Sequence, residues 1–474
     1  MAGLSSLSRR QVLRGSAGAV TTGAAALASR SSLAASNIVR QTGSKAEITF
    51  WHGFTDARGE TLQAFQALQT LVDQYNGLDR GVRVTALPYG SYEEIADNLV
   101  RSLGDGTAPD IVAMSEGLWF RFYLAGSIQP LDDLIASTGF DLGDIVPAFR
   151  AEGQRAGATW WLPFSRNTTL VYYNRDMLRA AGLDAFPGSW SEFAEIAPSL
   201  TDTGARVYGI AQSTIANLVA WAFQGVTWAF GGAYSDASLN ILIDQPGAVA
   251  AGTFYRRSIE EGWGYAAAQG DRDLHQGFAA ATIASTGLLN DLTTMAAATG
   301  FELGTAFLPS AEPGGPTAVP TGGSGLFIVG TAPAERQAAA FDFLTWCLAA
   351  EQTAFWAQNT GYMPVRTSAI ESQAMQDFFA ANTNFKTAVD QLLVARASDT
   401  ARTWVPGGDA IIADGVTRIL VEGANPQAIF TSVAAQLETE AGPVRDQIVA
   451  LEGSLGGPVT TPGATPAMTP AAAR

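Results

Sequence analysis

The segment that most constrains the fold covers residues 158–178, ATWWLPFSRNTTLVYYNRDML. An apolar run ends at Pro163, a polar patch follows at residues 165–167, and residues 168–173 are rich in the side chains that favour β-strands. A helical pattern begins directly afterwards. This order predicts a chain that leaves one domain, exposes a short polar patch and enters a second domain.

Length and charge support two domains and limit the partners. The chain has 474 residues, 47% of them hydrophobic, and a single core rarely grows beyond about 250–300 residues. Its net charge is −16, which argues against nucleic acid or an anionic membrane as a partner. A small anionic ligand is not excluded, because a guanidinium contacts a phosphate at short range, where salt screens little.

An export signal is expected at the amino terminus. Residues 8–14, SRRQVLR, form a twin-arginine pattern, and a mildly apolar stretch follows at residues 15–28. That stretch is too short for a membrane span, which takes about 20 apolar residues. We therefore predict a signal peptide over residues 1–35, cleaved after Ala28 or Ala35, and export by the twin-arginine translocase. The alternative is a disordered basic tail.

The chain has one cysteine, Cys347, in a helical pattern. A single thiol forms no internal disulfide, and no cysteine follows the signal to carry a lipid anchor. We expect a soluble, unlipidated monomer in a periplasm. Cys347 fits a buried apolar position better than a nucleophile, since His52 and His275 are the only histidines that could activate it.

Strands and helices alternate in the first part of the chain. Residues 45–51, 82–89 and 109–114 have strand patterns, and residues 60–75 have apolar side chains at helical spacing. This order predicts a mainly parallel sheet, and such sheets bind ligands at the carboxyl ends of their strands. The polar residues just past those ends are His52, Tyr92 and Glu116.

The helix after the second strand has a defined start. Ser91 and Glu94 have the spacing of a capping box, so Ser91 is the expected N-cap and Tyr92 the first helical residue. Unpaired backbone N–H groups and the positive end of the helix dipole lie there. Tyr92 could add a phenolic donor to an anion or polyol, or it could pack on the neighbouring strand.

Small residues mark three further positions. A strand pattern in residues 277–289 stops at Ser285, where hydroxyl groups and a glycine permit close approach of a ligand. The glycine-rich residues 322–325 indicate either a second crossover or a tight turn, and the turn is the default. Gly361 suits the left-handed position after a helix and directs Tyr362 beyond the helix end.

The remaining patterns are helical or disordered. Ser189 is an expected N-cap. Trp221 lies in an apolar segment, where most indoles are core, although one could face a ligand carbon chain. We predict helices from about residue 410 to 448, the last opening at Pro426. Residues 456–474, rich in Pro, Thr and Ala, predict a disordered tail.

These segments together resemble a known family. The motifs ITFWHGF, YGSYEEI, TAPDIV with SEG, LPFSRNTTLVYYNRD, AGLDAFPGSW, TIASTG, TGGSG and NTGYMPV occur in the order found in the extracellular solute-binding proteins of ABC importers (family 1). YGSYEEI, SEG and TIASTG are similar to the subgroup that takes up glycerol-3-phosphate or glycerophosphodiesters. The resemblance implies an α/β, two-lobed, type II-like binding-protein fold. Each lobe would have a mainly parallel sheet flanked by helices, with the ligand cleft between the lobes.

The resemblance also implies a set of ligand-binding residues. Two match residues that hold the ligand from one lobe: Tyr92 and Glu116. Five more match the rest of the site: Asn167, Ser285, Gly323, Tyr362 and Arg402. The segment after the arginine, TWVPGGDAI, matches poorly. Additional candidates are His52, Arg166 and Trp221.

The chemistry of this set suits a glycerol phosphate. A phosphate needs donors, which Arg402 and serine or tyrosine hydroxyls can supply. Glycerol hydroxyls need an acceptor such as the carboxylate of Glu116. The chain departs from the subgroup at Arg166 and Asn167, where serines are usual, and lacks a clear pocket-wall tryptophan in residues 210–219. A larger head group, as in glycerophosphocholine, would then have room.

We expect one lobe at residues 46–165 plus 327–350 and the other at 166–326 plus 351–455. The expected partners are a small-molecule ligand and the transmembrane subunits of an ABC permease, with no nucleic acid, cofactor, metal or catalytic residue. One alternative is an oligosaccharide-binding protein of the same fold, with aromatic stacking platforms. The other is an exported hydrolase, against which stand two histidines and the lack of GxSxG, HExxH and phosphate-loop patterns.

Overall fold

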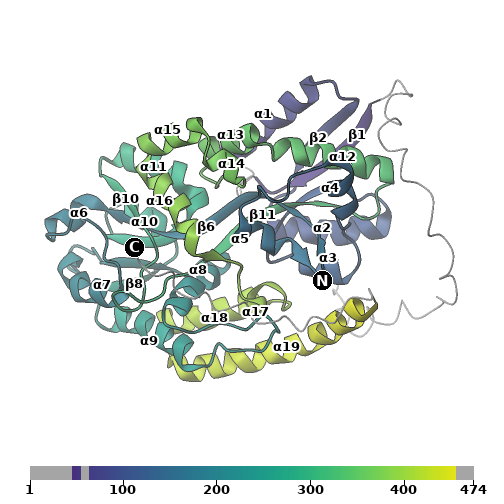
Figure 1. Cartoon of the computed structure of the whole chain (residues 1–474). Coiled ribbons are helices and arrows are strands. Elements are labelled where there is room, and N and C mark those ends of the chain that lie inside the picture. The colour runs from purple at the N-terminus through teal and green to yellow at the C-terminus, as the bar shows by residue number, and fades with distance from the viewer. Residues whose placement is uncertain (1–44, 55–62, 455–474) are drawn as a thin grey trace, which may run out of the picture. The chain divides into compact units, whose positions relative to one another are not determined.

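The computed structural model describes residues 45–54 and 63–454, which form a mixed α/β structure (Figure 1). The strands are β1 Ala46–His52, β2 Val82–Pro88, β3 Ile111–Ser115, β4 Gln154–Arg155, β5 Ala158–Thr159, β6 Leu162–Asn174, β7 Ile210–Ser213, β8 Gly264–Ala267, β9 Ala281–Ser285, β10 Leu303–Ala306, β11 Val319–Ile328 and β12 Ala395–Arg396. The predicted signal peptide (1–35) and tail (456–474) lie outside the described residues.

Helices cover the sheet and follow most strands. The α-helices are α1 Gln63–Gly77, α2 Tyr92–Asp105, α3 Phe120–Leu124, α4 Asp132–Thr138, α5 Pro147–Glu152, α6 Arg175–Ala180, α7 Trp190–Ile196, α8 Ala216–Ala229, α9 Pro246–Glu260, α10 Gly270–His275, α11 Leu289–Thr299, α12 Ala334–Cys347, α13 Ala350–Thr360, α14 Thr367–Ile370, α15 Gln373–Ala381, α16 Thr383–Asp390, α17 Thr400–Thr403, α18 Gly408–Val421 and α19 Pro426–Ser454. Short 3₁₀-helices are η2 Ala197–Leu200, η3 Thr286–Leu288 and η4 Gln391–Val394.

Two sets of parallel strands are joined by two crossing strands. Within the described residues the main sheet has the order β2-β1-β3-β11-β6-β9-β7-β8. Strand β1 is parallel to β2 and β3, and β7 is parallel to β8 and β9. Strands β6 and β11 are antiparallel to each other and lie between the two sets (Figure 1). This confirms the predicted two-lobed α/β fold, while the predicted lobe boundaries remain a prediction.

The chain passes from one set of strands to the other without leaving the sheet, because β6 changes its neighbour along its length. Thr168 of β6 pairs with Thr321 of β11, and the next residue, Thr169, pairs with Ser285 of β9. Strand β11 pairs with β3 as well, through Ile328 and Ile111. Strand β11 therefore joins one set through β3, strand β6 joins the other through β9, and the pairing of β6 with β11 connects the two sets.

The polar patch predicted to be exposed between domains is instead inside β6. Ser165 and Arg166 are fully buried, because the strand continues through the patch and pairs with β11 there. The patch does mark the crossover, but its side chains are enclosed. The prediction that these side chains are exposed was therefore wrong, while the prediction that residues 165–167 lie at the crossover was correct.

The default prediction of a tight turn at residues 322–325 was also wrong, since these residues lie within β11. Their glycines allow close packing. A Cβ on Gly325 would lie 2.0 Å from the Trp161 ring, and one on Gly322 would lie 2.7 Å from the Trp221 ring. Gly323 has φ +92°, and its Cβ would lie 1.9 Å from the Ser165 carbonyl oxygen. The alternative prediction, a second crossover at these residues, is the correct one.

Local end signals were predicted correctly. Ser91 caps α2 and forms a capping box with Glu94, and Ser189 does the same for α7. Gly361 ends α13 in the left-handed conformation, with φ +84°. Pro426 opens α19. These features depend on a few consecutive residues, so the sequence alone is sufficient to find them.

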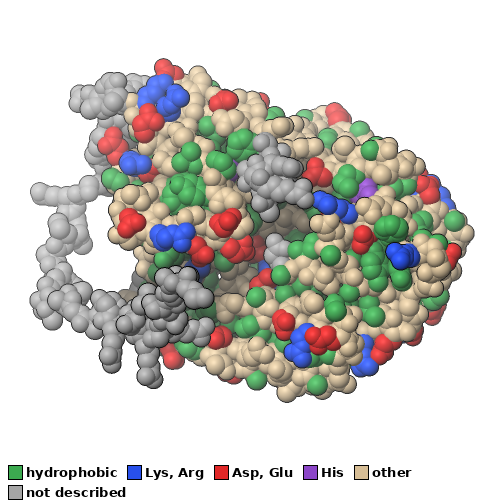
Figure 2. Space-filling view, turned by 180° about the vertical axis from the view of Figure 1, so that it is seen from behind, with side chains coloured by type: hydrophobic (Ala, Val, Ile, Leu, Met, Phe, Trp, Pro, Cys, Tyr) green, Lys and Arg blue, Asp and Glu red, His purple; other side chains and the backbone are tan. Residues whose placement is uncertain are grey.

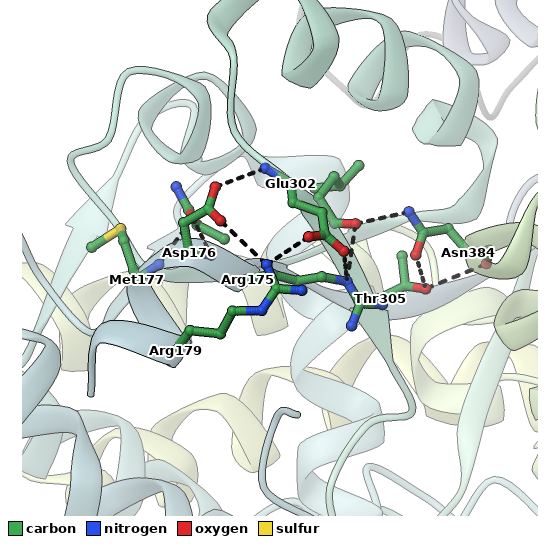
Figure 3. Close-up of polar contacts among 9 residues, drawn as sticks. Arg175, Asp176, Met177, Arg179, Glu302, Thr305 and Asn384 are labelled. Atoms are coloured by element: carbon green, nitrogen blue, oxygen red, sulfur yellow. Dashed lines mark hydrogen bonds and ion pairs between the residues drawn. The ribbon is translucent and has the colours of Figure 1, made fainter. Parts of the chain in front are cut away.

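Edge strand β10 is fixed by a polar cluster at the start of α6 (Figure 3). Arg179 donates to Glu302 at 2.6 Å, and the Glu302 backbone N–H donates to Asp176 at 3.0 Å. Asn384 of α16 donates to the Leu303 carbonyl at 3.1 Å. These contacts tie β10 to helices on either side of it.

Cys347 is buried at the end of α12 among apolar side chains, as predicted. Burial raises the pKa of its thiol well above the usual range. In the described part of the chain, none of the helices combines the length and the apolar character needed to cross a bilayer.

Candidate functional site

A cavity of about 540 Å³ lies against the two crossing strands, which contribute Asn167, Gly322 and Gly323 to its wall. The seven residues that the resemblance implied are all on that wall: Tyr92, Glu116, Asn167, Ser285, Gly323, Tyr362 and Arg402. Trp221, one of the additional candidates, also lines the cavity. The tertiary structure thus gathers residues that span more than 300 positions of the sequence.

Arg402 is held by two carboxylates of the cavity wall. It belongs to α17, and its guanidinium donates to Glu116, to Asp409 at 2.8 Å and to the Ser398 hydroxyl at 3.0 Å. Burial by itself lowers the pKa of Arg402, but Glu116 and Asp409 outweigh it and raise that pKa above its ordinary value. Arg402 therefore stays charged in the site.

Two tyrosines meet on another part of the wall. Tyr92 starts α2 and Tyr362 follows Gly361, and each hydroxyl interacts with the other. Burial raises the pKa of both phenols, and Tyr92 raises that of Tyr362 further. Both hydroxyls consequently remain protonated and can donate to a ligand oxygen.

Asn167 and Trp221 lie close together beside Gly322. The buried Oδ1 atom of Asn167 makes no hydrogen bond among the described residues. Trp221 donates from Nε1 to the Thr321 carbonyl at 3.0 Å, which fixes the indole on β11. A buried acceptor without a protein partner is costly, so Asn167 has capacity to bind a ligand or water donor.

Ser285 ends β9, as predicted. Its hydroxyl oxygen accepts from the Gly287 N–H at 3.0 Å, and its carbonyl accepts from the Tyr172 hydroxyl at 2.9 Å. The serine hydroxyl proton can still be donated toward the cavity. Gly287, also on the wall, packs against the Tyr362 ring.

Two additional candidates, His52 and Arg166, do not line the cavity. His52 is fully buried, stacks on Phe54 at a centroid distance of 5.4 Å, and burial lowers its pKa to about 4. Arg166 forms an ion pair with Glu152 and lies 5.2 Å from the Trp161 ring. Both side chains are therefore held in the core.

Glu152 has an unusual environment. Burial raises its pKa to about 7, against the opposing effect of Arg166, and the charge of Glu116 raises it further. Its Oε1 atom makes no hydrogen bond among the described residues. Glu152 and Glu116 therefore belong to one electrostatic network.

Sequence reasoning missed several polar residues of the wall. Asp409 follows Arg402 in the segment that matches the subgroup poorly, and Asp291 follows Ser285 by six residues. Together with Glu93 and Glu116 they bring the number of carboxylates on the wall to four, and Arg402 is the one guanidinium among the described lining residues. Figure 2 shows a face of the molecule that is hollowed beside a group of acidic side chains. Acidic residues near the motifs were the only available signal.

Residues 70–387 match the family model of the bacterial extracellular solute-binding proteins. The chain belongs to the bacterial extracellular solute-binding proteins. This solute-binding protein is 25% identical over 364 residues to the sn-glycerol-3-phosphate-binding periplasmic protein UgpB of Pectobacterium atrosepticum, covering 73% of this chain and 79% of the relative. It is 24% identical to UgpB of Escherichia coli, with 73% and 80% of the two chains covered.

Solved structures of solute-binding proteins, one of them a UgpB, also superpose on this chain. The solute-binding protein superposes on UgpB from Mycobacterium tuberculosis in complex with glycerophosphocholine with a TM-score of 0.77 and 34% identity, covering 85% of this chain and all of the other. The cyclic α-maltosyl-1,6-maltose binding protein of Arthrobacter globiformis has a TM-score of 0.71 at 24% identity, over 85% and 99% of the chains, which shows the shared fold alone. The predicted resemblance to the UgpB-type subgroup is confirmed.

Proposed function

We propose that this solute-binding protein captures glycerol-3-phosphate or a glycerophosphodiester such as glycerophosphocholine and delivers it to an ABC permease. The observation that supports this most is the convergence of Tyr92, Glu116, Asn167, Ser285, Gly323, Tyr362 and Arg402 on one cavity. In this proposal Arg402 and the hydroxyl groups donate to the phosphate. Arg402 uses Oε1 of Glu116, and we assign Oε2 to the hydroxyl groups of the glycerol.

A protein that delivers a solute to an importer has to be exported, and it needs no catalytic activity. We propose that Arg9 and Arg10 direct the protein through the twin-arginine pathway to the periplasm, where it acts as an unlipidated monomer. We assign no cofactor, metal or enzymatic role to the cavity. Turnover of chromogenic glycosides or bis-phosphodiesters by the purified protein would contradict a role in binding alone.

A sugar or oligosaccharide is the second candidate, because carboxylates outnumber the guanidinium on the wall. Carboxylates accept hydrogen bonds from sugar hydroxyls, and Trp221 offers an apolar surface for a sugar ring. Hydrolysis is the weaker alternative, supported only by the presence of paired carboxylates.

Calorimetry and thermal shift with glycerol-3-phosphate, glycerophosphocholine and maltose separate these candidates. A ligand at 100 times its dissociation constant should add about 2.7 kcal/mol to the free energy of unfolding. We expect this for at least one glycerol phosphate and not for maltose. Stabilisation by maltose alone would replace the proposal with the sugar candidate.

A further inference from the structure

Besides the ion pair of Glu116 and Arg402, a cluster of aromatic rings joins the two chain segments that carry these residues. Phe120 follows Glu116 by four residues, and Trp404 follows Arg402 by two. The rings of Phe120 and Trp404 stack with centroids 4.3 Å apart and planes at 10°. The segments are therefore connected twice, once through an ion pair in the cavity and once through an aromatic stack outside its lining.

Arg155 covers this stack. Its guanidinium carbon lies 4.5 Å from the Trp404 ring centroid and 5.8 Å from that of Phe120. Such cation–π contacts are stronger when the cation is desolvated, and the Arg155 side chain is only 11% exposed. The Trp160 indole donates to the Arg155 carbonyl at 3.0 Å, which fixes the hairpin that carries Arg155.

Glu452, in the last turn of α19, holds Arg155 in place. Its Oε1 atom accepts from Arg155 Nε at 2.5 Å and from the Tyr123 hydroxyl at 3.2 Å. Burial, together with the charge of Glu452, raises the pKa of Tyr123 to about 12. Glu452 itself is 3% exposed, so the far end of a 29-residue helix is anchored by a buried charge.

A buried ion pair of this kind contributes little net stability, because the cost of desolvating both charges offsets their attraction. What it provides is a fixed geometry. Glu452 binds the Nε atom of the Arg155 guanidinium, and the same guanidinium lies against the rings of Trp404 and Phe120. These rings are two and four residues from Arg402 and Glu116 in the sequence, so a shift of either ring reaches the ion pair through a short piece of chain.

We propose that Glu452 and Arg155 are positioning residues of the ligand site, which act through the Phe120–Trp404 stack to fix the separation of Glu116 and Arg402. The inference rests on the proposed function only in its choice of ligand. It assigns a role in solute binding to the carboxyl-terminal helix, whose Glu452 contributes nothing to the cavity wall.

The test compares Glu452→Gln and Arg155→Lys with a matched control on the same helix. Glu438→Gln removes an exposed carboxylate that pairs with Arg445 at 2.7 Å, away from the stack. Glutamine at position 452 keeps the shape but loses the charge, and lysine at 155 keeps the charge but loses the planar face. We expect each to weaken glycerophosphocholine binding about three- to tenfold in calorimetry, and Glu438→Gln to leave it unchanged.

Hydrogen exchange without ligand supplies an independent measurement. Glu452→Gln should speed amide exchange in residues 116–120 and 400–404 while the remaining core keeps its wild-type rates. Binding within twofold of wild type and unchanged exchange in both segments would overturn the inference. So would faster exchange throughout the protein, which would mean a general stabilising role. If the wild type fails to bind any glycerol phosphate, the proposed function fails, and the exchange data alone decide the positioning role.

Discussion

Arg402 and Glu116, which lie 286 positions apart in the chain, form a buried ion pair on the wall of the cavity. Asp409 binds a second nitrogen atom of the same guanidinium. A phosphate that approaches Arg402 therefore meets a cation already neutralised by the protein. Glu116 and Asp409 also orient the guanidinium before the ligand arrives, which reduces the ordering cost of binding.

Arg402→Ala should weaken binding of a phosphate-bearing ligand by about 2 to 5 kcal/mol, because a charge-assisted contact is lost. The variant also leaves the buried Glu116 and the partly exposed Asp409 without their guanidinium partner, so we expect a lower melting temperature. Calorimetry measures the first effect and circular dichroism the second. Native affinity in a folded variant would mean that other donors of the wall, such as the Tyr92 and Tyr362 hydroxyls, bind the phosphate.

Glu116→Gln should separate glycerol recognition from phosphate recognition. The change keeps the shape but removes the charge that strengthens bonds to ligand hydroxyls. Glycerol-3-phosphate and glycerophosphocholine should weaken together by about 1 to 3 kcal/mol. Choline phosphate has no glycerol hydroxyls and should bind as well as before, or more tightly because Arg402 is released. Equal losses for all three ligands in calorimetry would assign Glu116 a structural role.

Glu152 should make stability depend on pH in the acidic range. Burial raises its pKa to about 7 in the folded protein, whereas an unfolded glutamate titrates near about 4.3. The folded state binds the extra proton between these values, so the contribution is complete below the lower pKa and is lost as the pH rises through about 7. Denaturant titrations should show wild type gaining up to about 3 kcal/mol over Glu152→Gln between pH 8 and pH 4.5. A difference independent of pH would contradict this assignment.

Gly323→Ala should destabilise the crossover. The residue has φ +92°, and an added Cβ would lie 1.9 Å from the Ser165 carbonyl oxygen. We expect a loss of about 2 to 4 kcal/mol in the free energy of unfolding, from strain plus backbone displacement. Gly139→Ala is the control, since its φ is +67° but nothing lies within 4 Å of the added Cβ. Equal losses in the two variants would mean that the close approach to β6 is unimportant.

Replacing Arg9 and Arg10 by lysine should block export. The twin-arginine pattern of SRRQVLR is the proposed signal, so folded precursor should accumulate in the cytoplasm. Fractionation followed by immunoblotting, with the wild-type chain as control, measures the distribution. Normal delivery of the double variant would show that the pattern is incidental.

The alternation of strands and helices in the first part of the chain, and several helix starts and ends, could be predicted from sequence. Ser91 and Ser189 cap their helices because a serine and a glutamate three residues later satisfy the same N–H groups in any fold. The site residues needed more than periodicity. Tyr92 and Ser285 follow strand or helix signals, whereas Arg402 was located only through the family resemblance, and Asp409 and Asp291 were missed.

The sequence by itself determined the α/β alternation, the helix caps and the first place where the chain crosses, because each depends on neighbouring residues, whereas the second crossing at residues 322–325 could not be told from a tight turn. Only the tertiary structure decided which charges meet. It paired Arg402 with Glu116, enclosed Arg166 with Glu152, and placed the glycines of β11 against Trp161 and Trp221. Those outcomes depend on segments separated by up to hundreds of residues, and no local pattern encodes which of them come together when the sheet is assembled.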